Sequence, residues 1–344
     1  MSSPIEHFQR FFPESSVLNF EKLGNGHINE TFKVDFSTGG DSHSVIFQQV
    51  NRKIFAHPEK IVSNINLVAA HLRQNRYRYQ ILDVLLSPNV ADGDSWRVLP
   101  YFDHCKSLLT CDDAIQAERS AGIFAHHLYC LSELDPNRLN VIIPDFHNAS
   151  LRWKQFEDAL EKADDQRKKS AQQAIQFCFD NRFVIDLFEQ IHPELPIRVT
   201  HNDSKISNLL FDFKSLQPKV IIDLDTLQPG TVLSEFGDMV RSYCPSHGEE
   251  ETNLERVQFR SEIFLALKKS FQAETKSILT LTEQEALNHA GVITIFVQAL
   301  RFLTDYLNGD VYYGFIYPGQ NLNRALNQQH LLVQMMTWQK NQTA

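Results

Sequence analysis

The chain has 344 residues, of which 42 % are hydrophobic and 22 % charged, so its composition is that of a globular protein with room for two sizeable lobes. Its formal net charge of −9 argues against a nucleic-acid partner, because a phosphate backbone calls for a basic surface. No apolar run approaches the roughly 18 to 20 residues of a membrane span, so no membrane partner is expected. The sequence carries no indication of oligomeric state.

The cysteines and the N-terminal residues favour a cytoplasmic protein. The cysteines are odd in number and scattered, and none has the CxxC spacing of a zinc or redox site. Reduced, mostly buried thiols are typical of the cytoplasm. The first fifteen residues lack the basic and apolar regions of a secretory signal. The cysteines are Cys105, Cys111, Cys130, Cys178 and Cys244.

The first hundred residues predict strands and one helix. The dipeptide Asn25-Gly26 is a strong signal for a tight hairpin between two strands. Pro58 suits the first position of a helix, and the apolar residues after it recur at helical spacing. The expected strands are residues 18–23, 27–36, 44–50, 80–86 and 96–102, and the expected helix covers residues 58–74.

Beyond Asp103 the pattern changes to long amphipathic helices, and only residues 197–225 interrupt them with short strand-like runs. The sequence therefore predicts an α+β fold with two lobes. A small β-rich lobe, residues 1–102, leads through a hinge near residues 100–103 into a larger helical lobe, residues 103–344. The expected helices are residues 112–134, 151–163, 167–191, 254–277, 282–307 and 322–338.

Polar residues with a distinctive spacing lie in that interrupting segment, in the runs "VTHNDSKISNLLFD" and "VIIDLDT". Phosphoryl transfer needs a carboxylate beside the acceptor hydroxyl and hard oxygen ligands for Mg²⁺. The pattern His201-x-Asp203-x₄-Asn208 offers these residue types, with Asp203 as the base and His201 as a brace for the loop. Asn208 and Asp223 would hold metal. Asp225 either helps to hold it or supports the site from one layer behind.

Two other interpretations of this pattern are weaker. A lone "HND" is usually a turn with an Asx cap, but that explanation does not account for the whole set of residues. Hydrolytic metal chemistry would use His201, Asp203 and Asp223 as ligands. Metallohydrolases usually add further histidines around the metal, and the sequence has none near Asp223.

The layout resembles the aminoglycoside phosphotransferase and choline kinase family, small-molecule kinases with a protein-kinase-like fold. In that family H-x-D-x₄-N is the catalytic loop, and Ile222-Asp223 stands where protein kinases have the DFG motif. Further phrases, spread over about residues 19–334, are similar to the N-acetylhexosamine 1-kinase branch. They are "GNGHINETF", "VIFQQVN", "IPDFHN", "DLDTLQPGTVLSEFGDMVRS" and "RFLTDYLNGDVYYGFIYPGQNLNRA".

The resemblance implies ATP and Mg²⁺ as cofactors and a small sugar as the second substrate. For the nucleotide it implies a Gly-rich turn, a strand-3 residue and the hinge, which here are Gly24, Gly26, Gln48, Pro100, Tyr101 and Phe102. For the sugar it implies His27, Arg301, Asp305 and Tyr306. Without that resemblance, Arg301 and Asp305 would be interpreted as a surface ion pair, since they lie four apart on a helix. The tyrosines near that helix end either stack on the sugar or fill the core.

One departure from the kinase pattern concerns the strand-3 lysine and its glutamate partner. Gln48 stands where the lysine is expected, and Asn64 stands where the glutamate is expected. A Gln48–Asn64 hydrogen bond would keep the contact while losing both charges. We expect Arg52 or Lys53 to supply some of the missing positive charge.

The sequence thus predicts a kinase that phosphorylates the anomeric C1 hydroxyl of N-acetylglucosamine or N-acetylgalactosamine. Two alternatives stay open. One is the same machinery acting on another small alcohol, such as choline, homoserine or a different sugar. The other is a nucleotide-binding regulator without catalysis, which the missing lysine favours and the intact Asp203, Asn208 and Asp223 oppose. A protein kinase is disfavoured, because no activation segment fits between Asp223 and the next helix.

Overall fold

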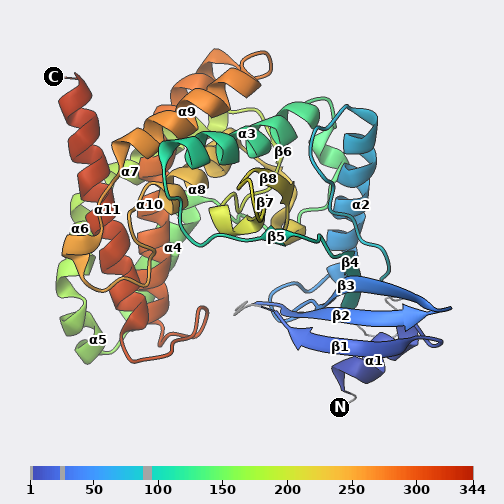
Figure 1. Cartoon of the computed structure of the whole chain (residues 1–344). Helices are drawn as coiled ribbons and strands as arrows, with labels where there is room; N and C mark the ends of the chain where they lie inside the picture. The colour runs from blue at the N-terminus through green and yellow to red at the C-terminus, as the bar shows by residue number, and fades with distance from the viewer. Residues whose placement is uncertain (1–2, 24–27, 88–94, 344) are drawn as a thin grey trace.

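The structure is a computed structural model that describes residues 3–23, 28–87 and 95–343. A small antiparallel sheet lies beside a larger helical body, with the N-terminus on the far side of the sheet (Figure 1). We call these parts the sheet lobe and the helical lobe. The predicted α+β fold with two lobes is confirmed, whereas the boundary at residue 102 stays a prediction.

The sheet lobe contains four strands in the order β1-β2-β3-β4. Helix α1 covers the face of this sheet that points away from the helical lobe (Figure 1). On that face Phe8 of α1 packs on strand residues, and the rings of Phe47 and Trp96 stack with centroids 4.4 Å apart. The bounds are α1 Pro4–Phe11, β1 Ser16–Lys22, β2 Glu30–Thr38, β3 Asp41–Gln49 and β4 Trp96–Pro100.

Alternation along the strands places polar residues on the face toward the helical lobe. Gln48 on β3 lies opposite Arg97 on β4 and Thr31 on β2. Because their neighbours Phe47 and Trp96 point into the α1 side, Gln48 and Arg97 point the other way. This register brings an amide and a guanidinium together above the helical lobe.

The prediction of a strand at residues 80–86 is wrong. Gln80 forms a single bridge to Val220 of the helical lobe, and Leu86 forms one to Val98 of β4. Because the two ends of the segment pair with different lobes, they cannot form one strand of a single sheet. The expected helix is confirmed as α2, Pro58–Gln74, which buries Ile61, Ile65, Val68 and Leu72 on one side.

Most of the expected helices of the helical lobe are confirmed with shifted ends. The single helix expected at residues 167–191 is wrong, because three short helices cover this range. The chain turns at Ala171 and again at Asn181, whose side-chain amide donates to the carbonyl oxygen of Phe177 and ends the second helix. The helix expected from residue 254 begins at residue 261. The bounds are α3 Ala114–Cys130, α4 Ala149–Lys162, α5 Asp165–Ser170, α6 Gln172–Asp180, α7 Phe183–Ile191, α8 Val232–Tyr243, α9 Ser261–Thr275, α10 Leu281–Leu307 and α11 Gln320–Thr343.

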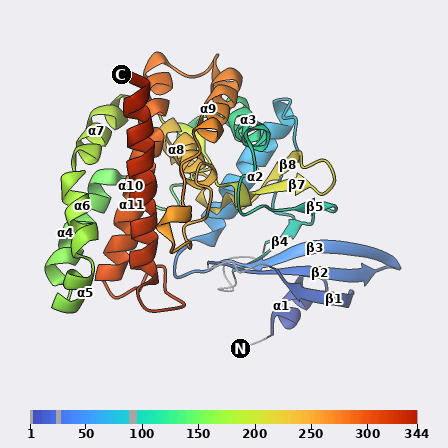
Figure 2. The ribbon, with the colours of Figure 1, turned by 60° about the vertical axis from the view of Figure 1, so that its left-hand side comes forward.

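Helix α10 is the centre of the helical lobe. It packs against α4, α8 and α11, and Figure 2 shows α10 and α11 side by side with α4 to α7 beyond them. A capping box of Thr280 and Glu283 begins the helix. By length and composition α10 alone among the described helices could cross a membrane, yet 78 % of its most apolar window is buried inside the fold. It is built as a core helix.

Two small sheets carry the polar segment found in the sequence. Strands β5, β7 and β8 form one, and β6 pairs with β9 in the other. The loop of residues 201–208 runs between β6 and β7, and Asp223 is the second residue after the end of β8. The bounds are β5 Cys105–Lys106, β6 Arg198–Thr200, β7 Leu209–Asp212, β8 Pro218–Ile221 and β9 Gln228–Gly230.

Candidate active site

His201 braces the loop of residues 201–208. Its Nε2 donates to the carbonyl oxygen of Ile222 at 2.9 Å, and its Nδ1 accepts from the backbone N–H of Asp203 at 3.2 Å. The ring is fully buried. One nitrogen therefore holds the loop itself, and the other joins the loop to the segment that carries Asp223.

Asp203 lies at the tip of the loop with its side chain 23 % exposed. Its Oδ2 accepts from Lys205 Nζ at 2.8 Å and from Asn208 Nδ2 at 2.9 Å, while Oδ1 has no partner among the described residues. Burial raises the pKa of Asp203, but the charge and hydrogen bond of Lys205 outweigh it and hold the pKa below its ordinary value. The carboxylate is thus kept ionised with one oxygen available.

Lys205 is a site residue that the sequence analysis missed. Attraction to Asp203 and Asp223 raises the pKa of its ammonium above the ordinary value despite burial, so the side chain stays charged. Its position two residues after Asp203, inside the motif itself, was a usable signal.

Asp223 lies on the segment that is bonded to this loop. Its backbone is left-handed, with φ 57° and ψ 52°, and its side chain is exposed without a hydrogen bond or ion pair to the described residues. Ile222 donates its N–H to the carbonyl oxygen of Asn208 at 2.9 Å. This bond keeps the two candidate metal ligands, Asn208 and Asp223, close together. Desolvation of the carboxyl group by the surrounding chain and the negative charge of Asp225 raise the pKa of Asp223.

These residues suit a divalent cation. Asn208 directs its Nδ2 to Asp203, which leaves its amide oxygen for a metal, and Asp223 offers an unpaired carboxylate. Mg²⁺ is commonly held by one or two carboxylate or amide oxygens and keeps several waters. Among the described residues, no group of three or more His, Cys, Asp or Glu side chains is arranged so that it could hold a metal ion.

Asp225 is 2 % exposed, and protein donors engage both of its oxygens. Oδ1 accepts from Arg97 Nη2 at 2.5 Å, and Oδ2 accepts from Asn29 Nδ2 at 2.7 Å. Its predicted metal role stays a prediction. The contacts seen in the structure instead tie the sheet lobe to the segment next to Asp223.

The amide of Gln48 is also engaged within the protein. Its oxygen accepts from Arg97 Nε at 3.0 Å and Nη2 at 2.5 Å, and its Nε2 donates to Thr31 Oγ1 at 2.9 Å. The hypothesis of a Gln48–Asn64 pair is wrong. Asn64 donates instead to the carbonyl oxygens of Asn140 and Leu227, so it anchors α2 on the helical lobe.

Arg301 and Asp305 are not paired with each other in the structure. The Arg301 guanidinium donates to Gln298 and lies 5.6 Å from the ring centroid of Tyr313, with the rings of Phe146 and Tyr312 at 5.5 and 5.9 Å. The buried Asp305 carboxylate accepts from the backbone N–H groups of Tyr312 and Tyr313 and from Asn321. Asp305 therefore shapes the loop that surrounds Arg301.

Tyr306 has structural contacts of its own. It is 8 % exposed, and its ring lies under the Arg167 guanidinium, 4.8 Å from the centroid. Its carbonyl oxygen also accepts from Arg167, which pairs with Asp310 at 2.7 Å. The structure places Tyr306 in the packing between α10 and α5.

Electrostatic interactions connect Arg301 with the loop of Asp203. Arg241 pairs with Asp238 and with Glu249, at 2.8 and 3.0 Å, and interacts electrostatically with both Asp203 and Arg301. His147, from the "IPDFHN" segment, donates to the Asn202 carbonyl oxygen at 2.9 Å. Two arginines thus share one region with the candidate base.

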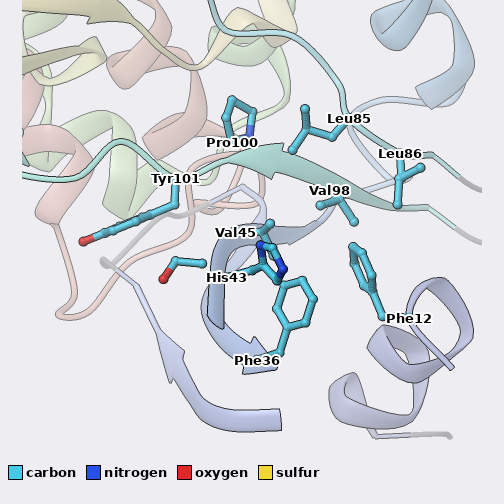
Figure 3. Close-up of a pocket in the computed structure, with 10 residues that line it drawn as sticks. Phe12, Phe36, His43, Val45, Leu85, Leu86, Val98, Pro100 and Tyr101 are labelled. Atoms are coloured by element: carbon cyan, nitrogen blue, oxygen red, sulfur yellow. The ribbon is translucent and has the colours of Figure 1, made fainter. Parts of the chain in front are cut away.

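The remaining candidates lie at the hinge or outside the described residues. Gly24, Gly26 and His27 fall outside them, and their roles stay predictions. Pro100 ends β4, and Tyr101 and Phe102 follow it, with Lys33 Nζ 4.6 Å from the Tyr101 ring centroid. Figure 3 shows a cavity of about 500 Å³ that reaches Pro100 and Tyr101. Its other lining residues include Phe12, Phe36 and Val98, so it lies on the α1 side of the sheet, away from Gln48 and Arg97.

Comparison with solved structures shows the fold of the chain. A GDP complex of wild-type aminoglycoside 2'-phosphotransferase-IIIa superposes with a TM-score of 0.58 at 14 % identity, covering 95 % of this chain and 99 % of that chain. A microcompartment-associated aminopropanol kinase gives 0.59 at 15 % identity, covering 98 % of both chains. The choline kinase of Cryptosporidium parvum Iowa II gives 0.53 at 12 % identity, covering 96 % of this chain and 91 % of that chain. The protein-kinase-like fold predicted from the sequence is thereby confirmed.

The family is shown by the sequence. Residues 20–259 match the model described as "Phosphotransferase enzyme family". That range contains the whole segment from His201 to Asp225. The chain belongs to the phosphotransferase enzyme family.

Proposed function

We propose that the protein is an ATP- and Mg²⁺-dependent kinase that phosphorylates the anomeric C1 hydroxyl of an N-acetylhexosamine, giving the sugar 1-phosphate. N-acetylglucosamine and N-acetylgalactosamine are the candidate acceptors. The family supports transfer of a phosphoryl group. The similarity of the longer sequence phrases to the N-acetylhexosamine 1-kinase branch supports the acceptor, and the free thiols agree with a cytoplasmic site of action.

Asp203 is the proposed base. Lys205 and Asn208 both bind its Oδ2, so the carboxylate is fixed in orientation and its Oδ1 is left to accept the hydroxyl proton. Lys205 keeps the carboxylate ionised in a partly buried place. A positioned base of this kind typically contributes about 10² to 10⁴ in rate.

Asn208 and Asp223 are the proposed holders of the metal. When bound, Mg²⁺ would orient the nucleotide phosphates and offset their charge. The open carboxylate of Asp223 and the amide oxygen of Asn208 are both hard donors. The adenine is proposed to contact the backbone at Pro100, Tyr101 and Phe102, with Gly24 and Gly26 over the phosphates.

The observation that carries the acceptor class is the charge around Asp203. Arg241 and Arg301 lie in this region, and the neighbouring carboxylates Asp238, Glu249 and Asp305 each accept from an arginine or from backbone donors. The two arginines would repel a cationic acceptor. A neutral sugar with hydroxyls and an amide fits the planar donors of Arg301 and the rings beside it.

A quaternary ammonium alcohol such as choline is a second candidate acceptor, because two tyrosine rings lie beside Arg301. Tyr312 and Tyr313 stand edge to face with centroids 4.8 Å apart, and aromatic rings also bind quaternary ammonium groups. The solved neighbours include choline and ethanolamine kinases. Arg301 over these rings opposes such a ligand.

A substrate panel tests the proposal. The protein is incubated with ATP and Mg²⁺ and, separately, N-acetylglucosamine, N-acetylgalactosamine, choline or homoserine, and the product is identified by phosphorus NMR. We expect an anomeric sugar phosphate with at least one hexosamine. Phosphocholine or phosphohomoserine as the main product would assign another alcohol. No acceptor-dependent ADP release across the panel would indicate a nucleotide-binding regulator.

A further inference from the structure

A single buried arginine occupies the place where the sheet lobe meets the segment of Asp223. Arg97 lies on β4 directly opposite Gln48 on β3 and is 3 % exposed. The kinase pattern puts a lysine at the Gln48 position. The cation missing from β3 is therefore present on the neighbouring strand, one cross-strand step away.

The guanidinium of Arg97 is locked from both lobes. Gln48 Oε1 accepts from its Nε and Nη2, and Asp225 Oδ1 accepts from Nη2 at 2.5 Å. Asp225 is in turn bound by Asn29, whose Oδ1 accepts from the N–H of Asn51 at 2.9 Å. A guanidinium held in this fork geometry loses little further conformational freedom on binding an anion.

The third nitrogen of this guanidinium is not engaged by the part of the chain that the structure describes. Arg97 Nη1 is buried and has no hydrogen-bond partner among the described residues. Leaving a buried donor without a partner costs free energy, so such a donor needs an explanation, and a bound anion is one that suits a guanidinium. Asp223, two residues before the Asp225 partner, has an exposed side chain.

We propose that Arg97 is the phosphate-binding cation of the nucleotide site. Gln48 and Asp225 fix the guanidinium, and Nη1 donates to a phosphate oxygen of the bound nucleotide. Arg97 thus replaces the charge that protein kinases place on strand β3, while its ion pair with Asp225 replaces the contact to the helix glutamate. The inference rests on the proposed nucleotide dependence, but it does not depend on which acceptor is used.

The test measures binding of ADP, in the presence of Mg²⁺, by titration calorimetry. Because no acceptor is needed, an error in the proposed acceptor leaves this measurement unaffected. The variant Arg97→Met/Asp225→Asn removes both charges of the pair, so it leaves no buried unpaired carboxylate. We expect its dissociation constant for ADP to rise about 10- to 100-fold, as for the loss of a hydrogen bond between charged groups.

The second part of the experiment moves the positive charge from position 97 to position 48. In Gln48→Lys/Arg97→Met the cation returns to β3, opposite its original position and within the same register. We expect this variant to bind ADP more tightly than Arg97→Met alone. The thermal midpoints of both variants are measured alongside, because a lysine that only re-paired Asp225 would restore stability and ADP affinity together. Recovery of ADP affinity beyond the recovery of the thermal midpoint supports the proposal, and no recovery of ADP affinity in a variant of restored stability would contradict it.

The matched control is another buried arginine–carboxylate pair. Arg198 and Glu283 are joined at 2.5 Å at the start of α10, and both are mostly buried. Arg198→Met/Glu283→Gln should lower the thermal midpoint without changing the dissociation constant for ADP. If Arg97→Met/Asp225→Asn binds ADP as the wild type does, the proposal is overturned. If the control weakens ADP binding equally, the effect of Arg97 is general destabilisation and the proposal is likewise overturned.

Discussion

Lys205 Nζ lies 2.8 Å from Asp203 Oδ2, so the candidate base carries its own counter-ion two residues along the chain. We predict that Lys205→Met lowers kcat by about 10- to 100-fold at neutral pH. Lys205 keeps the pKa of Asp203 low, and without it burial is the main influence and raises that pKa. The base then protonates at higher pH, so the acid limb of the pH profile of kcat/KM moves upward.

The control is another lysine–aspartate pair. Lys219 Nζ lies 3.7 Å from Asp212 Oδ2 on the surface, and Lys219→Met should leave both kcat and the pH profile unchanged. An acid limb at the same pH in Lys205→Met and wild type would contradict the role given to Lys205.

Gly230 makes room for the loop of residues 201–208. A Cβ at this position would lie 2.5 Å from Asn202 Oδ1 and even closer to Thr200 Oγ1. We predict that Gly230→Ala destabilises the protein by about 1–3 kcal/mol through overpacking, and lowers kcat because Asn202 precedes the base. Gly248→Ala, whose Cβ would meet open space, should change stability by less than about 0.5 kcal/mol. Urea unfolding and initial rates check both; equal stabilities for the two variants would refute the packing argument.

The Arg97–Asp225 pair should show strong coupling in stability. Arg97→Met alone leaves Asp225 buried and unpaired apart from Asn29, and we predict a loss of about 3–5 kcal/mol in the free energy of unfolding. Arg97→Met/Asp225→Asn should lose clearly less, since neither charge is then stranded. A double-mutant cycle by urea denaturation measures the coupling. Additive single effects would show that the two charges do not interact.

The burial of His127 predicts that the fold loses stability in acid. It is 2 % exposed, and burial, with smaller contributions from His201 and His126, lowers its pKa to about 3. Because the unfolded chain binds the proton first, the stability contributed by neutral His127 is present above about pH 6.5 and is lost as the pH falls toward 3. Without this group, the free energy of unfolding should fall less steeply as the pH is lowered, by about 1.4 kcal/mol per pH unit within that window.

The check is urea unfolding of His127→Gln at several pH values between 7 and 4. The comparison uses the slope against pH, so a constant loss of stability in the variant does not affect it. His43→Gln, at an exposed position on β3, should keep the wild-type slope. An unchanged slope in His127→Gln would mean that this histidine is not held neutral by burial.

The sequence predicted well where local chemistry decides the structure. Pro58 and the apolar spacing after it mark α2, and the His201–Asn208 spacing marks the loop that joins Asp203 to Asn208. The prediction failed where partners are distant. Residues 80–86 have strand-like composition, but their ends bridge to Val220 and Val98 in different lobes.

The same limit applies to the site. Arg97 was missed because "WRVLP" is only a strand by its pattern, and its partner Asp225 lies 128 residues away in the chain. The resemblance implied a place for Asp305 at the sugar, and that role stays a prediction, whereas the helical spacing alone suggested an ion pair with Arg301. In the structure the Asp305 carboxylate instead binds backbone N–H groups that come seven and eight residues later. Spacing on a helix shows which residues share a face, but not which partners they find.

The most direct measurement for the account is the rate of hexosamine phosphorylation by Asp203→Asn, with ADP affinity measured in parallel. Removing the base should lower kcat/KM by about 10² to 10⁴, while the dissociation constant for ADP stays within about twofold, since Asn208 and Asp223 are intact. A fall of less than tenfold would contradict the assignment of Asp203 as the base.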